Sequence, residues 1–167
     1  MSIAIPLLAA AVVAMSPPDP ASDQAAFKAA IVYNIGRFAT FAPGRRQGDG
    51  DLVVCIEDGD PLAPALGKLE GKPSGAGRLI VRRSGWPFAS GCGMAFVSQR
   101  HASASALGAL ADQGVLTVGE TADFADNGAV RLITIGRQTR FEINNSVAKR
   151  AGIALSAQLL HLAVKVR

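Results

Sequence analysis

Apolar residues recur along most of this chain at two spacings, one typical of amphipathic helices and one typical of buried strands. Between residues 22 and 41 they follow the helical spacing, and Ser22 is suited to cap the start of this helix. Asn34 falls within the apolar stripe, so its amide needs hydrogen-bonding partners. It either ties the helix to a neighbouring backbone or lines a pocket. The stripe consists of Phe27, Ile31, Ile35, Phe38 and Phe41.

Four short runs of strand length follow, and the first is continuously apolar, as in an inner strand that is covered on both faces. These runs are 52–56, 78–82, 94–98 and 115–118. Turns and short helical segments separate them, a pattern typical of parallel strands with helices packed on the sheet. Two later strands, 129–135 and 139–143, have so short a connection that they predict an antiparallel hairpin. The sequence therefore predicts a single-domain α/β fold, with a mixed, mainly parallel sheet of about five to six strands flanked by helices.

An acidic turn, Glu57 to Asp60, follows the first of the four apolar runs. In open α/β sheets, ligands tend to bind at the carboxyl ends of the strands. However, Asp60 followed by Pro61 is typical of a helix N-terminus, and this accounts for the turn. The turn contains no histidine or cysteine that would support a metal site, so we interpret it as the start of a helix.

The most site-like arrangement in the chain lies on the second strand of the hairpin. Arg140, Glu142 and Asn144 share one face of it, because side chains alternate along a strand. Asn144 also suits the N-cap of a following helix, and Arg140 with Glu142 can form a structural ion pair. The site interpretation and the structural one both stay open. The candidate contacts for a partner or ligand are Arg140, Glu142, Asn144 and Asn34.

Residues 1–14 form an uncharged apolar run that is too short to span a bilayer comfortably. Such a run is typical of the apolar part of a secretory signal peptide. We therefore expect residues 1–21 to be a signal peptide with a proline-rich lead-in, and residues 22–167 to be the mature domain. The alternatives are an uncleaved anchor or a buried strand.

The chain has two cysteines, Cys55 and Cys92. An even number of cysteines in an exported protein favours a disulfide. The two residues can meet if the runs at 52–56 and 94–98 are neighbouring strands. The alternative is a pair of buried free thiols that behave as small apolar side chains.

The net charge of +4 comes from basic residues that are scattered along the chain. They carry no interleaved aromatic residues, so we do not expect nucleic-acid binding. The chain shows no nucleophile-elbow serine, no P-loop and no GxGxxG motif. Its two histidines and two cysteines offer no evident zinc ligand set. We therefore expect a protein that is not an enzyme and that carries no metal or cofactor.

Three stretches, taken in order, resemble the YfiR family, whose domain is also called DUF4154. The resemblance covers about residues 22–164 and is carried by 26–38, 92–98 and the segment from Arg140 to Leu160. It implies a periplasmic α/β domain of the kind found in dimers. Its best-known members repress an inner-membrane diguanylate cyclase by binding the periplasmic portion of that enzyme. This repression lowers cyclic di-GMP and biofilm formation.

The resemblance also has consequences for particular residues. Cys55 and Cys92 match a family disulfide pair, whereas this chain lacks the second pair that some members have. Some members bind small ligands near the C-terminal motif and can carry basic residues there, where this chain has Ala154 and Ser156. This difference argues against anion binding at that position. The alternative function is a periplasmic small-ligand sensor that acts on another receptor or kinase, with Arg140, Glu142 and Asn144 lining its pocket.

Overall fold

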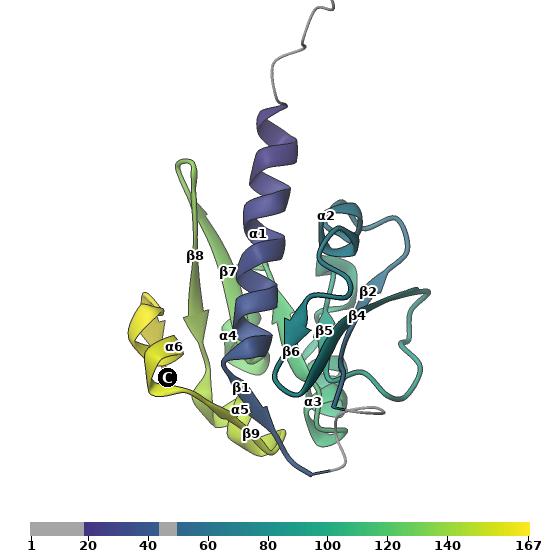
Figure 1. Ribbon diagram of the computed structural model, residues 1–167. Helices are drawn as coiled ribbons and strands as arrows, with labels where there is room; N and C mark the ends of the chain where they lie inside the picture. Colours follow the sequence, from purple (N-terminus) through teal and green to yellow (C-terminus); the bar gives the residue numbers. More distant parts are fainter. Residues whose placement is uncertain (1–18, 44–49) are drawn as a thin grey trace, which may run out of the picture.

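The computed structural model describes residues 19–43 and 50–167 and places helices on both faces of a central sheet (Figure 1). The helices are α1 (Pro20–Arg37), α2 (Ala63–Gly67), the 3-10 helix η1 (Gln99–His101), α3 (Ala104–Asp112), α4 (Phe124–Asn127), α5 (Asn145–Arg150) and α6 (Ala157–Leu162). The strands are β1 (Ala39–Phe41), β2 (Leu52–Glu57), β3 (Pro73–Ser74), β4 (Gly77–Ser84), β5 (Met94–Phe96), β6 (Leu116–Gly119), β7 (Val130–Ile135), β8 (Gln138–Ile143), β9 (Ile153–Leu155) and β10 (Lys165–Val166).

The central sheet has eight strands in the order β10-β8-β7-β6-β5-β2-β4-β3. Its middle strands, β4, β2, β5, β6 and β7, are parallel, while β8 and β3 each pair antiparallel with a neighbour. The predicted α/β class and the β7–β8 hairpin are confirmed. The sheet is mixed and has eight strands, where about five to six mainly parallel strands were predicted. The number was too low because β3 and β10 have two residues each and show no periodicity.

A second sheet contains only β1 and β9, which pair antiparallel. The predicted first helix is therefore too long at its C-terminal end, since Phe41 belongs to β1. The helix also begins earlier than predicted. Asp19, not Ser22, is the N-cap, and its side chain accepts a hydrogen bond of 3.0 Å from the amide of Ala21.

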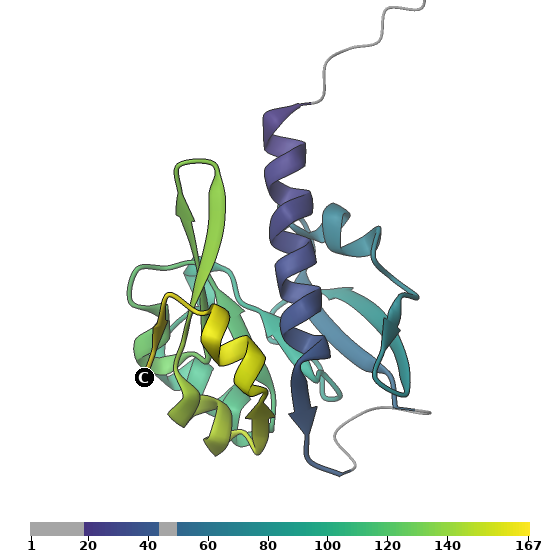
Figure 2. The same ribbon diagram turned by 60° about the vertical axis from the view of Figure 1, so that its left-hand side comes forward.

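The long helix α1 packs on the sheet with only its C-terminal half. Ala29, Val32 and Ile35 are buried there, and Gly36 lies against Leu52 and Met94 so closely that a Cβ atom would meet the Met94 sulfur at 2.7 Å. Phe27, which was predicted on the buried stripe, is 64% exposed. The N-terminal half of α1 extends beyond the sheet, beside the β7–β8 hairpin (Figures 1 and 2).

The side chains of β2 show how the core is divided between the two faces of the sheet. Leu52, Val54 and Ile56 join the cluster that contains α1, α2 and α6 residues. Val53 and Cys55 point to the other face, into a cluster with residues of α3 and with Phe124 of α4. Burial on both faces explains why β2 is an uninterrupted apolar run.

The C-terminal helices begin where the sequence predicts. Asn144 and Ser156 cap α5 and α6 through side-chain hydrogen bonds from Val147 and Leu159, each 3.2 Å long. Apolar spacing places Leu162 on the apolar side of α6, but this residue is 57% exposed. Within residues 19–43 and 50–167, no helix has the length and apolar character to cross a membrane. The predicted signal peptide falls mainly on residues 1–18, outside the described residues.

Candidate functional site

The carboxyl ends of β2 and β5 mark the point where the direction of the chain across the sheet reverses. From β2 the chain continues to β4 on one side, and from β5 it continues to β6 on the other. In open α/β sheets, the crevice at such a switch point is the usual place for a ligand. The loops after β2, β5 and β6 meet here, which makes this edge the candidate functional site.

On one side of this edge, a buried carboxylate collects several polar partners. Glu57, the last residue of β2, accepts hydrogen bonds from the Ser98 hydroxyl at 2.9 Å and from Arg100 Nη2 at 2.6 Å. His101 Nε2 lies 3.4 Å from the same carboxylate, and its ring stacks on Trp86 with the ring centres 4.7 Å apart. The arrangement holds the loops after β4 and β5 against the end of β2.

The environment of Glu57 changes the pKa of its carboxyl group in two opposing ways. Removal from water raises the pKa, whereas the hydrogen bonds from Ser98 and Arg100 and the nearby charges of Arg100 and His101 lower it. Together, the polar partners outweigh the loss of water, and the pKa of Glu57 is lowered below its ordinary value. Glu57 is therefore an ionised structural anchor at neutral pH and not a proton donor.

This lowered pKa predicts how stability depends on pH. Because Glu57 binds its proton less readily in the folded chain than in the unfolded one, its contribution is complete above its ordinary pKa of 4.5. That contribution is lost as the pH falls through the lower folded value. Urea unfolding measured between about pH 3 and pH 7 should show a smaller loss of stability on acidification for Glu57→Gln than for the wild type. Glu70→Gln, which removes an exposed carboxylate, is the control. An acid loss of equal size in Glu57→Gln and the wild type would contradict the prediction.

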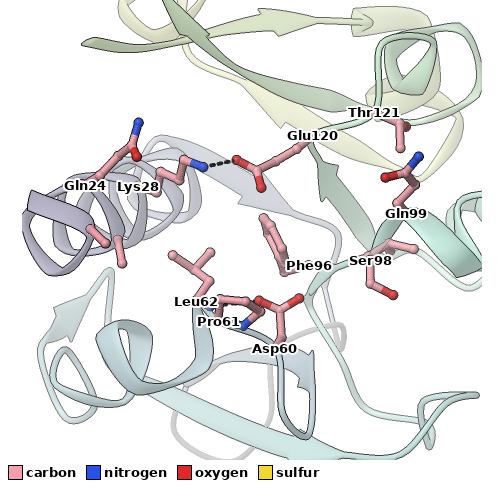
Figure 3. A pocket seen from close by; sticks show the side chains of 13 residues that line it. Gln24, Lys28, Asp60, Pro61, Leu62, Phe96, Ser98, Gln99, Glu120 and Thr121 are labelled. Carbon is pink, nitrogen blue, oxygen red and sulfur yellow. Dashed lines mark hydrogen bonds and ion pairs between the residues drawn. The ribbon is translucent and has the colours of Figure 1, made fainter. Parts of the chain in front are cut away.

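On the α1 side of the same edge lies an open cleft of about 350 Å³. Figure 3 shows Lys28 of α1 reaching across to Glu120, which follows β6, and their charged groups are 2.5 Å apart. Asp60 lies on the opposite wall, and its carboxylate accepts a hydrogen bond of 2.8 Å from the amide of Leu62. The lining residues are Ala21, Gln24, Ala25, Lys28, Asp60, Pro61, Leu62, Phe96, Val97, Ser98, Gln99, Glu120 and Thr121.

Burial raises the pKa of Asp60, and the neighbouring carboxylates of Glu120 and Glu57 raise it further. The hydrogen bond from the amide of Leu62 and the charge of Arg100 lower the pKa of Asp60 but do not cancel these effects. The acidic turn interpreted from sequence as a helix start thus contributes to the cleft as well. Asp60 does hold the loop before α2, but the N-cap position itself belongs to Leu62.

The structure places the predicted contact residues away from the cleft. Asn34 is exposed, so the prediction that it belongs to the buried stripe was wrong. The adjacent Tyr33 makes the tie between α1 and a neighbouring backbone instead, because its hydroxyl donates to the carbonyl of Pro73 at 2.6 Å.

Arg140 and Glu142 do not act as one unit. Glu142 pairs with Arg131, which lies directly opposite it on β7, at 3.3 Å. A residue directly across an antiparallel pair is closer than one two positions along the same strand, which explains the choice of partner. Arg140 is exposed on β8.

Asn144 has structural roles that use both ends of its amide. Its oxygen accepts the capping hydrogen bond from Val147, and its nitrogen donates to the carbonyl of Ala125 at 2.8 Å. The hollow of about 490 Å³ beside the C-terminal motif is lined by Asn145, Lys149, Gly152, Ile153, Ala154, Leu155 and Leu160.

Cys55 and Cys92 form a disulfide that joins β2 to the segment before β5. The two strands are parallel neighbours, as the sequence required for the two residues to meet. The bond is buried on the α3 side of the sheet, two residues from Glu57.

A protein-family model described as YfiR/HmsC-like matches residues 25–164. The match spans most of the chain and includes the switch-point loops, the disulfide and the C-terminal motif. The chain belongs to the YfiR/HmsC-like family. No curated protein sequence matches it. The family resemblance based on residues 26–38, 92–98 and 140–160 is thereby confirmed.

For this YfiR/HmsC-like domain, sequence reasoning missed the cluster around Glu57 and the cleft beside it. A signal was present, because Glu57 and Asp60 follow one parallel strand and Ser98 to His101 follow another. The carboxyl ends of parallel neighbours meet at one edge. Placing Lys28 and Glu120 at the same edge required the position of α1, which apolar spacing does not give.

Proposed function

We propose that this protein is a periplasmic regulatory binding protein that represses a membrane diguanylate cyclase by binding the periplasmic portion of that enzyme. The observation that carries the proposal is the YfiR/HmsC-like match over residues 25–164. The predicted signal peptide and the Cys55–Cys92 disulfide support an oxidising compartment outside the cytoplasm. Repression then lowers cyclic di-GMP and biofilm formation.

Repression by binding requires the protein to have a higher affinity for the inactive state of the cyclase than for its active state. The domain then shifts the cyclase population without taking part in any chemistry. This role needs no reactive group at the switch point, where the carboxylate of Glu57 is paired with Arg100.

The contact surface that we favour lies on the projecting part of the molecule. Phe27 on α1 is 64% exposed and Ile135 at the hairpin tip is 59% exposed. A hollow of about 250 Å³ next to them is lined by Phe27, Asp23 and Arg137 among others. Apolar anchors beside charged groups are typical of protein interfaces. Arg140, exposed on the same hairpin, is a further candidate contact.

Phe27→Ser tests this surface. We expect the variant to bind the periplasmic portion of the cyclase roughly ten-fold more weakly or worse, because exposed aromatic residues often dominate binding. Biolayer interferometry with the oxidised mature protein measures the affinity. Leu162→Ser is the matched control, since Leu162 is also exposed but lies on α6. Equal affinity of both variants and the wild type would place the interface elsewhere.

The function itself is tested by deletion and by capture. Loss of the gene should raise cyclic di-GMP, and the wild-type gene should restore the lower level. Tagged mature protein in oxidising buffer should retain a membrane protein with a diguanylate cyclase output domain. If deletion leaves cyclic di-GMP unchanged and no such protein is retained, the proposal is wrong.

We also propose that the domain forms a homodimer, as the family resemblance implies. Light scattering during gel filtration gives the mass of the purified protein directly. The alternative function, a small-ligand sensor acting on another receptor or kinase, is favoured by one observation, which is the cleft at the switch point.

A further inference from the structure

The cleft on the α1 side of the switch point has the position and size of a ligand site. Its walls come from α1 and from the loops that follow β2, β5 and β6. Its volume of about 350 Å³ falls within the range of pockets that hold small molecules. The cleft adjoins the hollow beside Phe27, since Gln24 of α1 lines both. The inference below does not rest on the proposed repression.

The charges that line this cleft do not balance. Its charged residues are Lys28, Asp60 and Glu120, which give one positive and two negative charges. Lys28 is already paired with Glu120 at 2.5 Å. Oδ1 of Asp60 accepts the Leu62 amide, and within residues 19–43 and 50–167 no hydrogen bond reaches its Oδ2. The cleft therefore carries an uncompensated negative charge on the Asp60 wall.

The floor between the two carboxylates is apolar. Figure 3 shows the ring of Phe96 between Glu120 and Asp60, with Leu62 beside it. Phe96 and Leu62 are each 4% exposed, and Val97 is 1% exposed. An aromatic face next to carboxylates favours a cation that also has an apolar part.

We propose that this cleft binds a small organic ammonium ion, with its ammonium group between Asp60 and Glu120 and its apolar part on Phe96. An anion is disfavoured, because Lys28 is occupied and the remaining charge is negative. A bare metal ion is disfavoured too, since the apolar floor supplies no oxygen ligands. Burial, followed by the carboxylates of Glu120 and Glu57, raises the pKa of Asp60, and a bound cation would favour the charged form of this group.

Three probes of similar shape separate charge from apolar contact. They are phenethylamine, which is a cation, 2-phenylethanol, which is neutral, and phenylacetate, which is an anion. Each is titrated into the ¹⁵N-labelled, oxidised full mature domain at pH 7 and followed by nuclear magnetic resonance. We expect phenethylamine to shift the amide signals of Leu62, Val97 and Thr121 in a saturable way. The other two probes should bind at least roughly ten-fold more weakly, because they lose the charge-assisted hydrogen bonds.

Asp60→Asn should raise the dissociation constant of phenethylamine by roughly ten-fold or more. Asp58→Asn is the matched control, since Asp58 lies in the same turn but is exposed outside the cleft. It should leave the affinity unchanged. Should Asp60→Asn fail to fold, Glu120→Gln tests the other carboxylate and should also weaken binding.

The pH dependence provides a second readout. Asp60 lines the cleft together with Glu120 and Lys28, and the charges of Glu57 and Arg100 also act on it. Protonation of Asp60 removes the charge that the ligand needs. Affinity should therefore fall on acidification, starting above the ordinary pKa of 3.8 for an aspartate, and Asp60→Asn should show a smaller fall. Equal binding of the three probes, no saturable binding, or shifts confined to another surface would each overturn the proposal.

Discussion

Replacing both Cys55 and Cys92 with alanine is expected to lower the free energy of unfolding by about 4 kcal/mol. The disulfide connects residues with a sequence separation of 37, and without it the unfolded chain gains the entropy of that open loop. Cys55 is completely buried and Cys92 nearly so, so lost packing adds to the effect. Urea unfolding measures the difference, and the single tryptophan, Trp86, provides the fluorescence signal.

Reduction with dithiothreitol separates the contribution of the disulfide to stability from that of side-chain packing, because it breaks the bond and keeps both cysteine side chains. It should lower the stability of the wild type towards that of the double variant, and it should leave the double variant unchanged. A wild-type protein that unfolds at the same urea concentration with and without reductant, although its thiols are shown to be free, would contradict the expectation. In the reduced protein, Trp86 and its stack on His101 should loosen first, because Cys92 ends the segment that carries Trp86.

Much of the fold followed from the apolar pattern, for a physical reason. Strands covered on both faces need uninterrupted apolar runs, and β2, β5 and β6, which are buried along their whole length, lie at or near the predicted runs. The caps at Asn144 and Ser156 were predictable because they depend only on local hydrogen bonds. The two-residue strands β3 and β10 were not, since contacts with distant residues alone define them.

The exposure of Phe27 is a feature that the helical spacing of apolar residues does not predict. Helical spacing indicates which residues share a face, but it does not indicate how far a helix extends beyond the sheet that covers this face. Gly36 and Ile35 pack on the sheet and Ala29 is buried, whereas Phe27 on the same helix is 64% exposed. The same uncertainty about tertiary arrangement hid the cleft, because Lys28 and Glu120 are 92 positions apart in the sequence.

The candidate site was only half predictable from the residues. Glu57 and Asp60 were recognised as lying at a strand end, but an acidic turn has a simpler structural explanation by itself. What turns them into a site is the strand order, in which β2 and β5 are neighbours although β4 lies between them in sequence. Arg140 and Glu142 illustrate the opposite case, since a local pattern looked like a site until β7 supplied Arg131.

Phe124→Ala is expected to lower the free energy of unfolding by about 3–5 kcal/mol, which is typical of removing a fully buried phenylalanine. Phe124 is 1% exposed and belongs to the cluster on the α3 side of the sheet. Its ring lies against Gly119, at the end of β6, and against Gly128, so closely that a Cβ atom at either glycine would overlap the ring. Thermal or urea unfolding measures the loss, and Phe27→Ala, at an exposed phenylalanine, should change stability by no more than about 0.5 kcal/mol.

Gly119 and Gly128 determine how large the loss of stability in Phe124→Ala should be. Because neither has a side chain that could move into the space left by the ring, the site cannot collapse easily, which places the expected loss towards the upper end of the range. Gly119→Ala should itself destabilise the protein by about 1–3 kcal/mol through overpacking, but should cost less when combined with Phe124→Leu.

Glu120 directly follows Gly119, so Phe124→Ala should also weaken binding of phenethylamine at temperatures where the variant remains folded. Unchanged stability in Phe124→Ala would show that α4 does not hold the end of β6 in place.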